Sequence, residues 1–287
     1  MSPDLRMSLK SIRDGRGITF LVPFTPGVAE DRDRIWDWSR RHWLARLPGV
    51  QVIVADDPDH FNVLPTHPFS KAAAVNAAGT QARGDIVVII DADAYVDAAL
   101  IRFCAAEIRK ARRAGRRLWY VPYRRFWRLS AEATERVLTS SPKRPWHPAD
   151  PPAEGDVDPE SRAKATFGSF FAAMVMVMPI EAFEESGGMD PRFNQGWGGE
   201  DISFKRQVDT IYGSHKTIDG PVYHLCHGTL GGTGLNREWA GQTKAAPFAL
   251  LGARYLAALG DRARMLRLVD EWKHPTMTEE VSDETTT

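Results

Sequence analysis

The first hundred residues alternate between short apolar runs and helix-like stretches. Three runs rich in β-branched residues predict strands at Ile18 to Val22, Val50 to Ala55 and Asp85 to Ile90. Between them, the tryptophan-rich stretch from Ile35 to Leu44 and an alanine-rich stretch from about Ser70 to Arg83 predict helices. Near-continuous apolar strands that alternate with helices indicate an α/β fold with a mostly parallel, Rossmann-like sheet covered by helices.

The second half of the chain continues with less regular patterns. Ala98 to Ala114 predicts a helix, and Leu118 to Tyr123 and Phe167 to Met178 predict strands. Ala245 to Trp272 predicts one amphipathic C-terminal helix. Its expected buried stripe consists of Leu250, Leu251, Tyr255, Leu256, Leu259, Met265, Leu266 and Val269.

Composition limits the function classes. The 287 residues are 43% apolar and 26% charged, which suits one large domain with a core or one domain with a small appendage. Thirty-seven basic and 37 acidic residues cancel, so only a local patch could attract nucleic acid or an anionic membrane. The longest apolar stretch, Phe170 to Met178, is far shorter than the roughly 20 residues of a membrane helix. We expect a soluble, cytoplasmic protein.

Candidate chemistry gathers at one edge of the predicted sheet. In open parallel sheets, ligands bind beyond the carboxyl ends of the strands. Those ends carry Pro23-Phe24, Asp56-Asp57 and Asp91-Ala92-Asp93. We call this edge the rim and expect the functional site there.

Asp91 and Asp93 are one residue apart after an apolar strand. Alternate side chains of an extended chain share a face, so both carboxylates can point into one cleft. Their mutual repulsion predicts a divalent cation, Mg²⁺ or Mn²⁺, as counterion. The alternative is that the two acids only form a turn before a helix that begins near Asp97.

Two later segments offer further polar groups. Residues 194–201 read NQGWGGED, in which glycines surround Trp197 and Glu200-Asp201 precede an amphipathic run. The glycines predict a mobile segment, and the two acids are either a helix cap or contain a general base. Farther on, His224 and His227 would lie on opposite faces of a strand, so only one is expected to reach a metal and to favour Mn²⁺ over Mg²⁺.

Together these motifs resemble glycosyltransferases of the GT-A fold, over roughly Ile18 to Gly228. The N-terminal half resembles family 2, and Phe167 to Phe204 resembles the C-terminal region that β-1,4-galactosyltransferases share with polypeptide N-acetylgalactosaminyltransferases. The most specific pieces are Asp91-Ala92-Asp93 and Gly196 to Asp201. The stretch from Phe69 to Asn76 also resembles the family pattern F-N-R-A-x-x-x-N, with a lysine in place of the arginine.

The resemblance implies a role for each matching position. Asp201 would be the base and Glu200 would orient the acceptor. The metal would bind Asp93 and His224, with His227 as the fallback. The implied donor-binding residues are Pro23, Phe24, Asp56, Asp57, Lys71, Asn76, Asp91, Ala92, Asp93, Trp197 and Gly198.

The implied activity is metal-dependent transfer of a hexose from a nucleotide-diphosphate sugar, with a UDP-sugar favoured, to the hydroxyl of a glycan, protein, small molecule or DNA acceptor. The cofactor would be Mn²⁺ or Mg²⁺. A single base implies inversion, but the polypeptide transferases share the glycine-tryptophan segment and retain configuration. Thr25-Pro26-Gly27 replaces the basic R-N-R of galactosyltransferases and Ile202-Ser203 replaces further acids, so nucleotide and acceptor preferences stay open.

The same resemblance suggests the domain organisation. An N-terminal extension (1–17) precedes a GT-A domain (18–240), which a C-terminal helix (241–274) and a disordered tail (275–287) follow. Within the domain we expect a nucleotide-binding half (18–97), an acceptor and catalytic half (165–230) and a flexible loop (140–160). Six prolines between Ser140 and Pro159 suggest that this loop is a mobile lid or an acceptor-side insertion.

Other function classes compete with this interpretation. Nine basic residues between Arg109 and Arg128 are interleaved with aromatic ones, as in a nucleic-acid-binding surface, which would favour a glycosyltransferase that modifies DNA bases. The ordinary alternative is a solvated helix face followed by a half-buried strand. A nucleotidyltransferase would also use paired aspartates and a metal but gives Gly196 to Asp201 no role. A non-catalytic sugar- or nucleotide-binding module would not need Asp93, Asp201 and His224 together.

Overall fold

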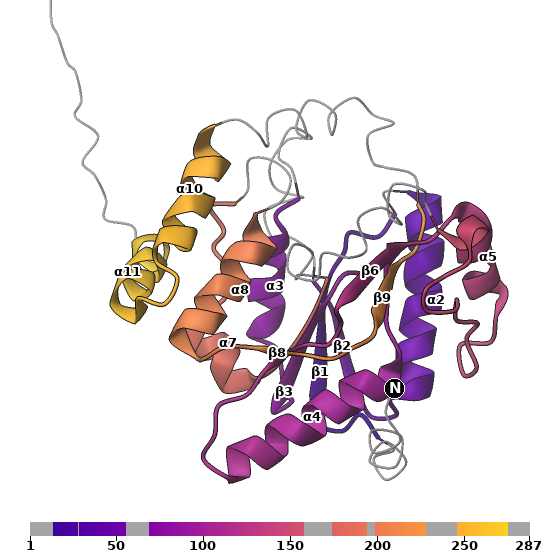
Figure 1. Cartoon of the computed structure of the whole chain (residues 1–287), viewed down its shortest axis with the longest axis horizontal. Coiled ribbons are helices and arrows are strands. Elements are labelled where there is room, and N and C mark those ends of the chain that lie inside the picture. Colours follow the sequence, from indigo (N-terminus) through magenta and orange to yellow (C-terminus); the bar gives the residue numbers. More distant parts are fainter. Residues whose placement is uncertain are drawn as a thin grey trace, which may run out of the picture.

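A computed structural model describes residues 14–27, 29–55, 69–157, 174–193, 199–227 and 246–274 (Figure 1). Its centre is a six-stranded sheet in the order β2-β1-β3-β7-β5-β8. Only β7 runs antiparallel to its neighbours, so the mostly parallel α/β sheet is confirmed. In chain order the strands are β1 (Ile18–Pro23), β2 (Gln51–Ala55), β3 (Ile86–Ile90), β5 (Tyr120–Val121), β7 (Val175–Pro179) and β8 (Lys216–Thr217).

Helices cover both faces of this sheet (Figure 1). On one face lie α2 (Glu30–Arg46) and α4 (Ala98–Arg113), and the other face carries α3, α7 and α8. Every residue of β3 is at most 1% exposed, as the continuous apolar run predicts for a strand that is buried on both sides. The three helices on that second face are α3 (Lys71–Gly79), α7 (Ile180–Ser186) and α8 (Glu200–Ile211).

A second, three-stranded sheet has the order β4-β9-β6. It consists of β4 (Ala94–Tyr95), β6 (Arg125–Arg128) and β9 (Pro221–His224). Of the strand predicted from Leu118 to Tyr123, only Tyr120–Val121 form a strand, β5 of the central sheet, and β6 of the second sheet begins after it at Arg125. Of the strand predicted from Phe167 to Met178, residues 175–178 are in β7, Met174 precedes it, and 167–173 lie outside the described residues.

The predicted single C-terminal helix is wrong, because the segment forms a hairpin of two helices, α10 (Ala246–Ala257) and α11 (Arg262–Lys273). Gly260 breaks it with a φ of 80°, and the Asp261 side chain then caps α11 by accepting a hydrogen bond from the Arg264 N–H. Of the predicted buried stripe, Tyr255, Met265 and Val269 are buried, and Leu251 and Leu266 are partly buried. Leu250, Leu256 and Leu259 instead face solvent.

The proline-rich segment is held to the body of the protein as far as Val157. It follows α5 (Ala131–Thr139) and contains a short 3₁₀ helix, η1 (Glu154–Asp156). The Trp38 indole donates to the Ser140 carbonyl, and Arg125 forms an ion pair with Asp150. Residues 140–157 therefore give no support to a mobile lid, and 158–160 lie outside the described residues.

His42 lies buried where α2 meets this segment. Its Nδ1 is 2.9 Å from the Pro142 carbonyl oxygen, and its ring stacks on Trp38 with centroids 5.2 Å apart. Burial lowers the pKa of His42 to about 4, because an imidazolium would lose its hydration there. The ring is therefore neutral at pH 7.

We predict that His42 makes the fold acid-sensitive. Between about pH 6.5 and 4 the unfolded chain binds a proton that the folded chain excludes, so the free energy of unfolding falls as pH falls, by about 3 kcal/mol over the window. Urea unfolding of the wild type and of His42→Phe, measured across this window, should show a flatter pH dependence in the variant. Parallel curves would contradict the prediction, since the carboxylates titrate equally in both proteins.

Candidate metal centre and its acidic surroundings

The rim begins where β3 ends at Ile90. The Asp91 N–H donates to the Met174 carbonyl, and the Ala94 N–H closes a turn onto the Asp91 carbonyl. The turn alternative is therefore correct for the backbone. The following helix is capped by a different acid, because the Asp97 side chain accepts from the Ala99 N–H at 2.9 Å. The carboxylates of Asp91 and Asp93 are thus not used as caps.

Asp93 meets two histidines because β4 pairs antiparallel with β9. Ala94 lies opposite His224, and the Leu225 N–H donates to the Asp93 carbonyl at 2.9 Å. The Asp93 Oδ2 is 3.0 Å from the Nε2 of His227 and 3.8 Å from the Nε2 of His224. The ligand atoms of all three residues lie within 4.8 Å of one another. The strand pairing therefore brings Asp93 close to His227, which lies 134 positions later in the sequence.

The expectation that the two imidazoles lie on opposite faces of a strand is wrong. It assumed a strand through Cys226, but β9 ends at His224. Beyond that residue the side chains no longer alternate between faces, and the two imidazole centroids lie 5.1 Å apart on the same side.

The three donors suit one divalent cation. Ligand atoms about 2.1 Å from an ion lie roughly 3 to 3.5 Å from each other, close to the separations from Asp93 to the two imidazoles. Burial alone would raise the pKa of Asp93, but the neighbouring His224 and His227 lower it below its usual range. Burial lowers the pKa of His224, which keeps that imidazole neutral. An ionised carboxylate and a neutral imidazole are the forms that bind metals.

Beside these donors, Lys71 joins the rim to two helices. It is the first residue of α3, which Ser70 caps by accepting from the Ala73 N–H. The Lys71 Nζ lies 2.6 Å from Asp91 Oδ1 and 2.8 Å from Asp201 Oδ1. Asp201 is in the first turn of α8, and its side chain turns towards Lys71 instead of capping that helix.

The acidic groups around Lys71 outnumber the positive charge. Burial raises the pKa of Asp91, Glu200 and Asp201, and the carboxylates raise one another's further. Burial also disfavours the charged Lys71, but Asp201 and Asp91 outweigh that effect and raise its pKa. One lysine therefore faces three carboxylates, with Asp93 next to them. Such an excess favours a bound cation.

The other predicted donor-binding residues have different surroundings. Pro23 ends β1 at the rim and Phe24 follows it, but both are buried, and the Phe24 ring packs against Trp36. Ala92 is also buried. The Asn76 amide is bonded on both sides to the Met189 backbone, at 2.7 and 2.8 Å, so it fastens α3 to the segment after α7. Asp56, Asp57, Trp197 and Gly198 lie outside the described residues.

Sequence reasoning missed two neighbours of the site. The Tyr123 hydroxyl accepts from the Met174 N–H at 3.3 Å. Burial raises the pKa of Tyr123, and the nearby charges of Asp201 and Asp91 raise it further. Arg32, on the first turns of α2, helps to lower the pKa of Asp93. Its place just after the rim end of β1 was the available signal, whereas nothing in the sequence around Tyr123 distinguished it from a core residue.

The basic and aromatic run does not form a stacking surface. Its five large aromatic residues are at most 8% exposed, so they cannot stack on bases: Trp119, Tyr120, Tyr123, Phe126 and Trp127. Several of its arginines are paired with carboxylates, such as Arg109 with Asp85 and Arg117 with Glu185. The structure agrees with the ordinary alternative, a solvated helix face followed by a half-buried strand, since the aromatic residues are buried and Arg128 of β6 is exposed.

No protein-family model matches the chain, and no curated protein matches it. Among solved structures, the catalytic domain of Drosophila β1,4-galactosyltransferase 7 with xylobiose gives a TM-score of 0.37 at 16% identity, over 70% of this chain and 63% of that one. S. aureus TarS gives 0.44 at 13%, over 85% and 43%. Glucosyl-3-phosphoglycerate synthase from Mycobacterium tuberculosis, with Mn²⁺ and UDP-glucose, gives 0.43 at 15%, over 88% and 83%. The chain thus spans less than two thirds of the first two.

Within the described residues, no helix is long and apolar enough to cross a membrane.

We predict that Lys71 stabilises the metal-free protein. In Lys71→Met, three partly buried carboxylates lose their cation, so the free energy of unfolding in EDTA should fall by about 3 kcal/mol, the lower end of the range for breaking a buried pair. Urea denaturation near neutral pH measures this, with the exposed Lys110→Met on α4 as the matched control. A change in Lys71→Met no larger than that of the control would contradict the ion-pair account.

Proposed function

We propose that the protein is a metal-dependent glycosyltransferase of the GT-A type that moves a hexose from a nucleotide-diphosphate sugar, with a UDP-sugar favoured, to an acceptor hydroxyl. The observation that carries the proposal is the convergence of Asp93, His224 and His227 at the end of β3. The site lies at the carboxyl ends of parallel strands, where open α/β sheets bind ligands. The strands and helices that alternate before Asp93 would form the nucleotide-binding half.

Asp93, His224 and His227 would hold the cation. A carboxylate with two imidazoles is a more nitrogen-rich set than Mg²⁺ prefers, so we favour Mn²⁺. A divalent ion there would supply positive charge to the departing nucleoside diphosphate. Lys71 is the second source of positive charge, and it would turn from the carboxylates towards the diphosphate when the donor binds. Asp91 would then lie free to contact the donor ribose.

Asp201 is the proposed base. It begins a helix at the rim and lies in a buried acidic cluster that raises its pKa, and a carboxylate with a raised pKa is a better proton acceptor. Movement of Lys71 towards the donor would free it, so that it accepts the acceptor's proton as the hydroxyl attacks. Glu200 would orient the acceptor. One base on the acceptor side supports inversion of configuration.

The remaining roles complete the donor pocket. Pro23, Phe24 and one of Asp56 or Asp57 would border the nucleotide, and Trp197 with Gly198 would cover the sugar and exclude water. The acceptor class stays open between glycan, protein and small molecule. A DNA acceptor is disfavoured because the aromatic residues of the basic run are buried. The alternative is a nucleotidyltransferase, which would also use the two aspartates, but its reaction would not require Glu200 and Asp201 at the start of α8.

The metal proposal is tested by Asp93→Asn. Loss of the one carboxylate ligand should abolish the thermal stabilisation that Mn²⁺ gives the wild type and lower nucleoside diphosphate release at least about 100-fold. Thermal shift with Mn²⁺ and a product assay over UDP-, GDP- and TDP-sugars measure both effects. The exposed Asp37→Asn on α2 serves as the control. Wild-type turnover that persists in excess EDTA would disprove metal dependence.

The base proposal is tested by Asp201→Asn. The variant should bind the nucleotide-sugar and Mn²⁺ within a few-fold of wild type, while transfer falls about 10²–10⁴-fold because no group accepts the acceptor's proton. Calorimetry measures donor binding and a product assay measures transfer, with Asp270→Asn on the outer side of α11 as the control. Near-normal transfer would mean that another group is the base.

A further inference from the structure

The outer face of α10 is apolar although it faces solvent. Among the described residues, five large apolar side chains are exposed, and three of them belong to the hairpin. Leu250, Leu256 and Leu259 are 64%, 54% and 50% exposed. From Leu250 to Leu259 the only charged residue is Arg254. A helix that is apolar on both its packed and its outer side has a second partner besides the core.

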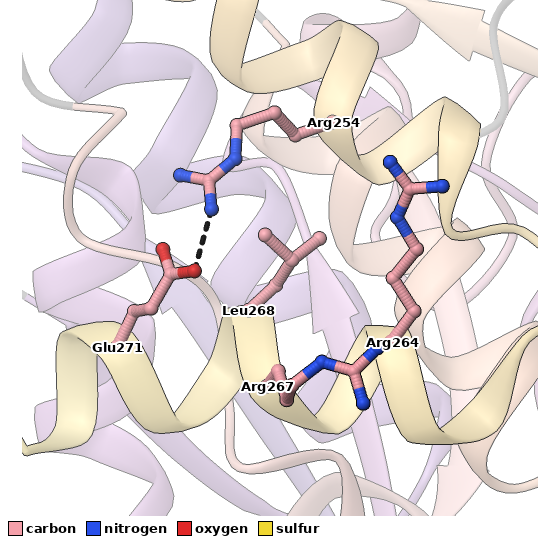
Figure 2. A pocket seen from close by; sticks show the side chains of 5 residues that line it. All are labelled: Arg254, Arg264, Arg267, Leu268 and Glu271. Carbon is pink, nitrogen blue, oxygen red and sulfur yellow. Dashed lines mark hydrogen bonds and ion pairs between the residues drawn. The ribbon is translucent and has the colours of Figure 1, made fainter.

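The hairpin also carries several arginines. Between Leu250 and His274 there are five basic and three acidic residues. Figure 2 shows Arg254 on α10 and Arg264 and Arg267 on α11 around a shallow pocket with Leu268 between them. Arg254 pairs with Glu271, whereas no described carboxylate lies within ion-pair distance of Arg264 or Arg267. The pocket therefore keeps a net positive charge.

We propose that the α10–α11 hairpin docks on the surface of an anionic membrane. The exposed leucines would enter the boundary between headgroups and acyl chains, and Arg264 and Arg267 would contact lipid phosphates. An apolar face next to basic side chains is the pattern of helices that lie in the plane of a membrane interface. The net charge of the chain is zero, so the attraction would come from a local basic patch, which this hairpin provides beside its apolar residues.

Charge complementarity favours a bilayer over a second copy of the chain. A twofold contact through α10 would bring the arginines of both copies together without the acids to neutralise them. A lipid surface instead offers a continuous layer of phosphates. In Figure 1, α10 lies at the edge of the molecule beyond α8, and it begins at the end that carries the rim. Docking would hold the acidic start of α8 near the membrane surface.

Vesicle binding tests the proposal. Wild-type protein is sedimented with phosphatidylcholine vesicles that contain phosphatidylglycerol, and with pure phosphatidylcholine vesicles. We expect binding to the anionic vesicles only, weakened by salt. Leu250→Glu/Leu256→Glu and Arg264→Gln/Arg267→Gln should each lower the partition coefficient at least about tenfold. The matched controls are Leu44→Glu, an exposed leucine on α2, and Arg113→Gln on α4.

Several outcomes would overturn the proposal: equal binding to both vesicle types, a loss in Leu44→Glu as large as in the hairpin variant, or a dimer of the wild type in light scattering that the leucine variant abolishes. Stabilisation by inorganic phosphate without vesicle binding would also overturn it. Donor hydrolysis and thermal unfolding of each variant show that the site and fold are intact, so a failure here is distinct from a failure of the proposed activity.

Discussion

The site depends on the register between two very short strands. Ala94 of β4 lies opposite His224 of β9, and the Leu225 N–H donates a hydrogen bond to the Asp93 carbonyl. This register holds the Asp93 side chain beside both imidazoles. A shift by one residue would turn the His224 side chain to the other face. The second sheet is thus small but decides the chemistry, since it brings a residue from the end of β3 to two residues far along the chain. The central sheet only supplies the rim.

A second constraint is the excess of partly buried negative charge. Lys71 bonds to Asp91 and Asp201 and so ties α3, the end of β3 and the start of α8 into one cluster. One ammonium group cannot compensate every carboxylate present, and the desolvation of the others costs folding free energy. A ligand that brings positive charge recovers that cost, so metal binding and stability are linked. The same carboxylates that cost folding free energy would attract a cation.

Sequence reasoning succeeded where one local pattern determines the structure. The apolar runs of β1 and β3 located the rim, and with it Asp91 and Asp93. It failed where the structure depends on the residue at which an element ends. The His227 imidazole lies beside Asp93 because β9 ends at His224. The C-terminal segment forms a hairpin because Gly260 adopts a positive φ. Tertiary packing decided the rest. Asn76 bonds to the Met189 backbone, a partner that no spacing in the sequence reveals.

The error about the C-terminal leucines is informative in another way. Periodicity placed Leu250 and Leu256 with Tyr255 in one stripe, but a helix that ends at Ala257 offers the core only one side, and Tyr255 with Ala258 fills it. Leu250 and Leu256 lie outside the side of α10 that packs on the core, so the core does not require them and they remain exposed. Sequences tend to break the ordinary pattern where a site has a task other than folding. The apolar outer face therefore supports a partner other than the core, and Arg264 and Arg267, which have no described carboxylate within ion-pair distance, favour an anionic partner.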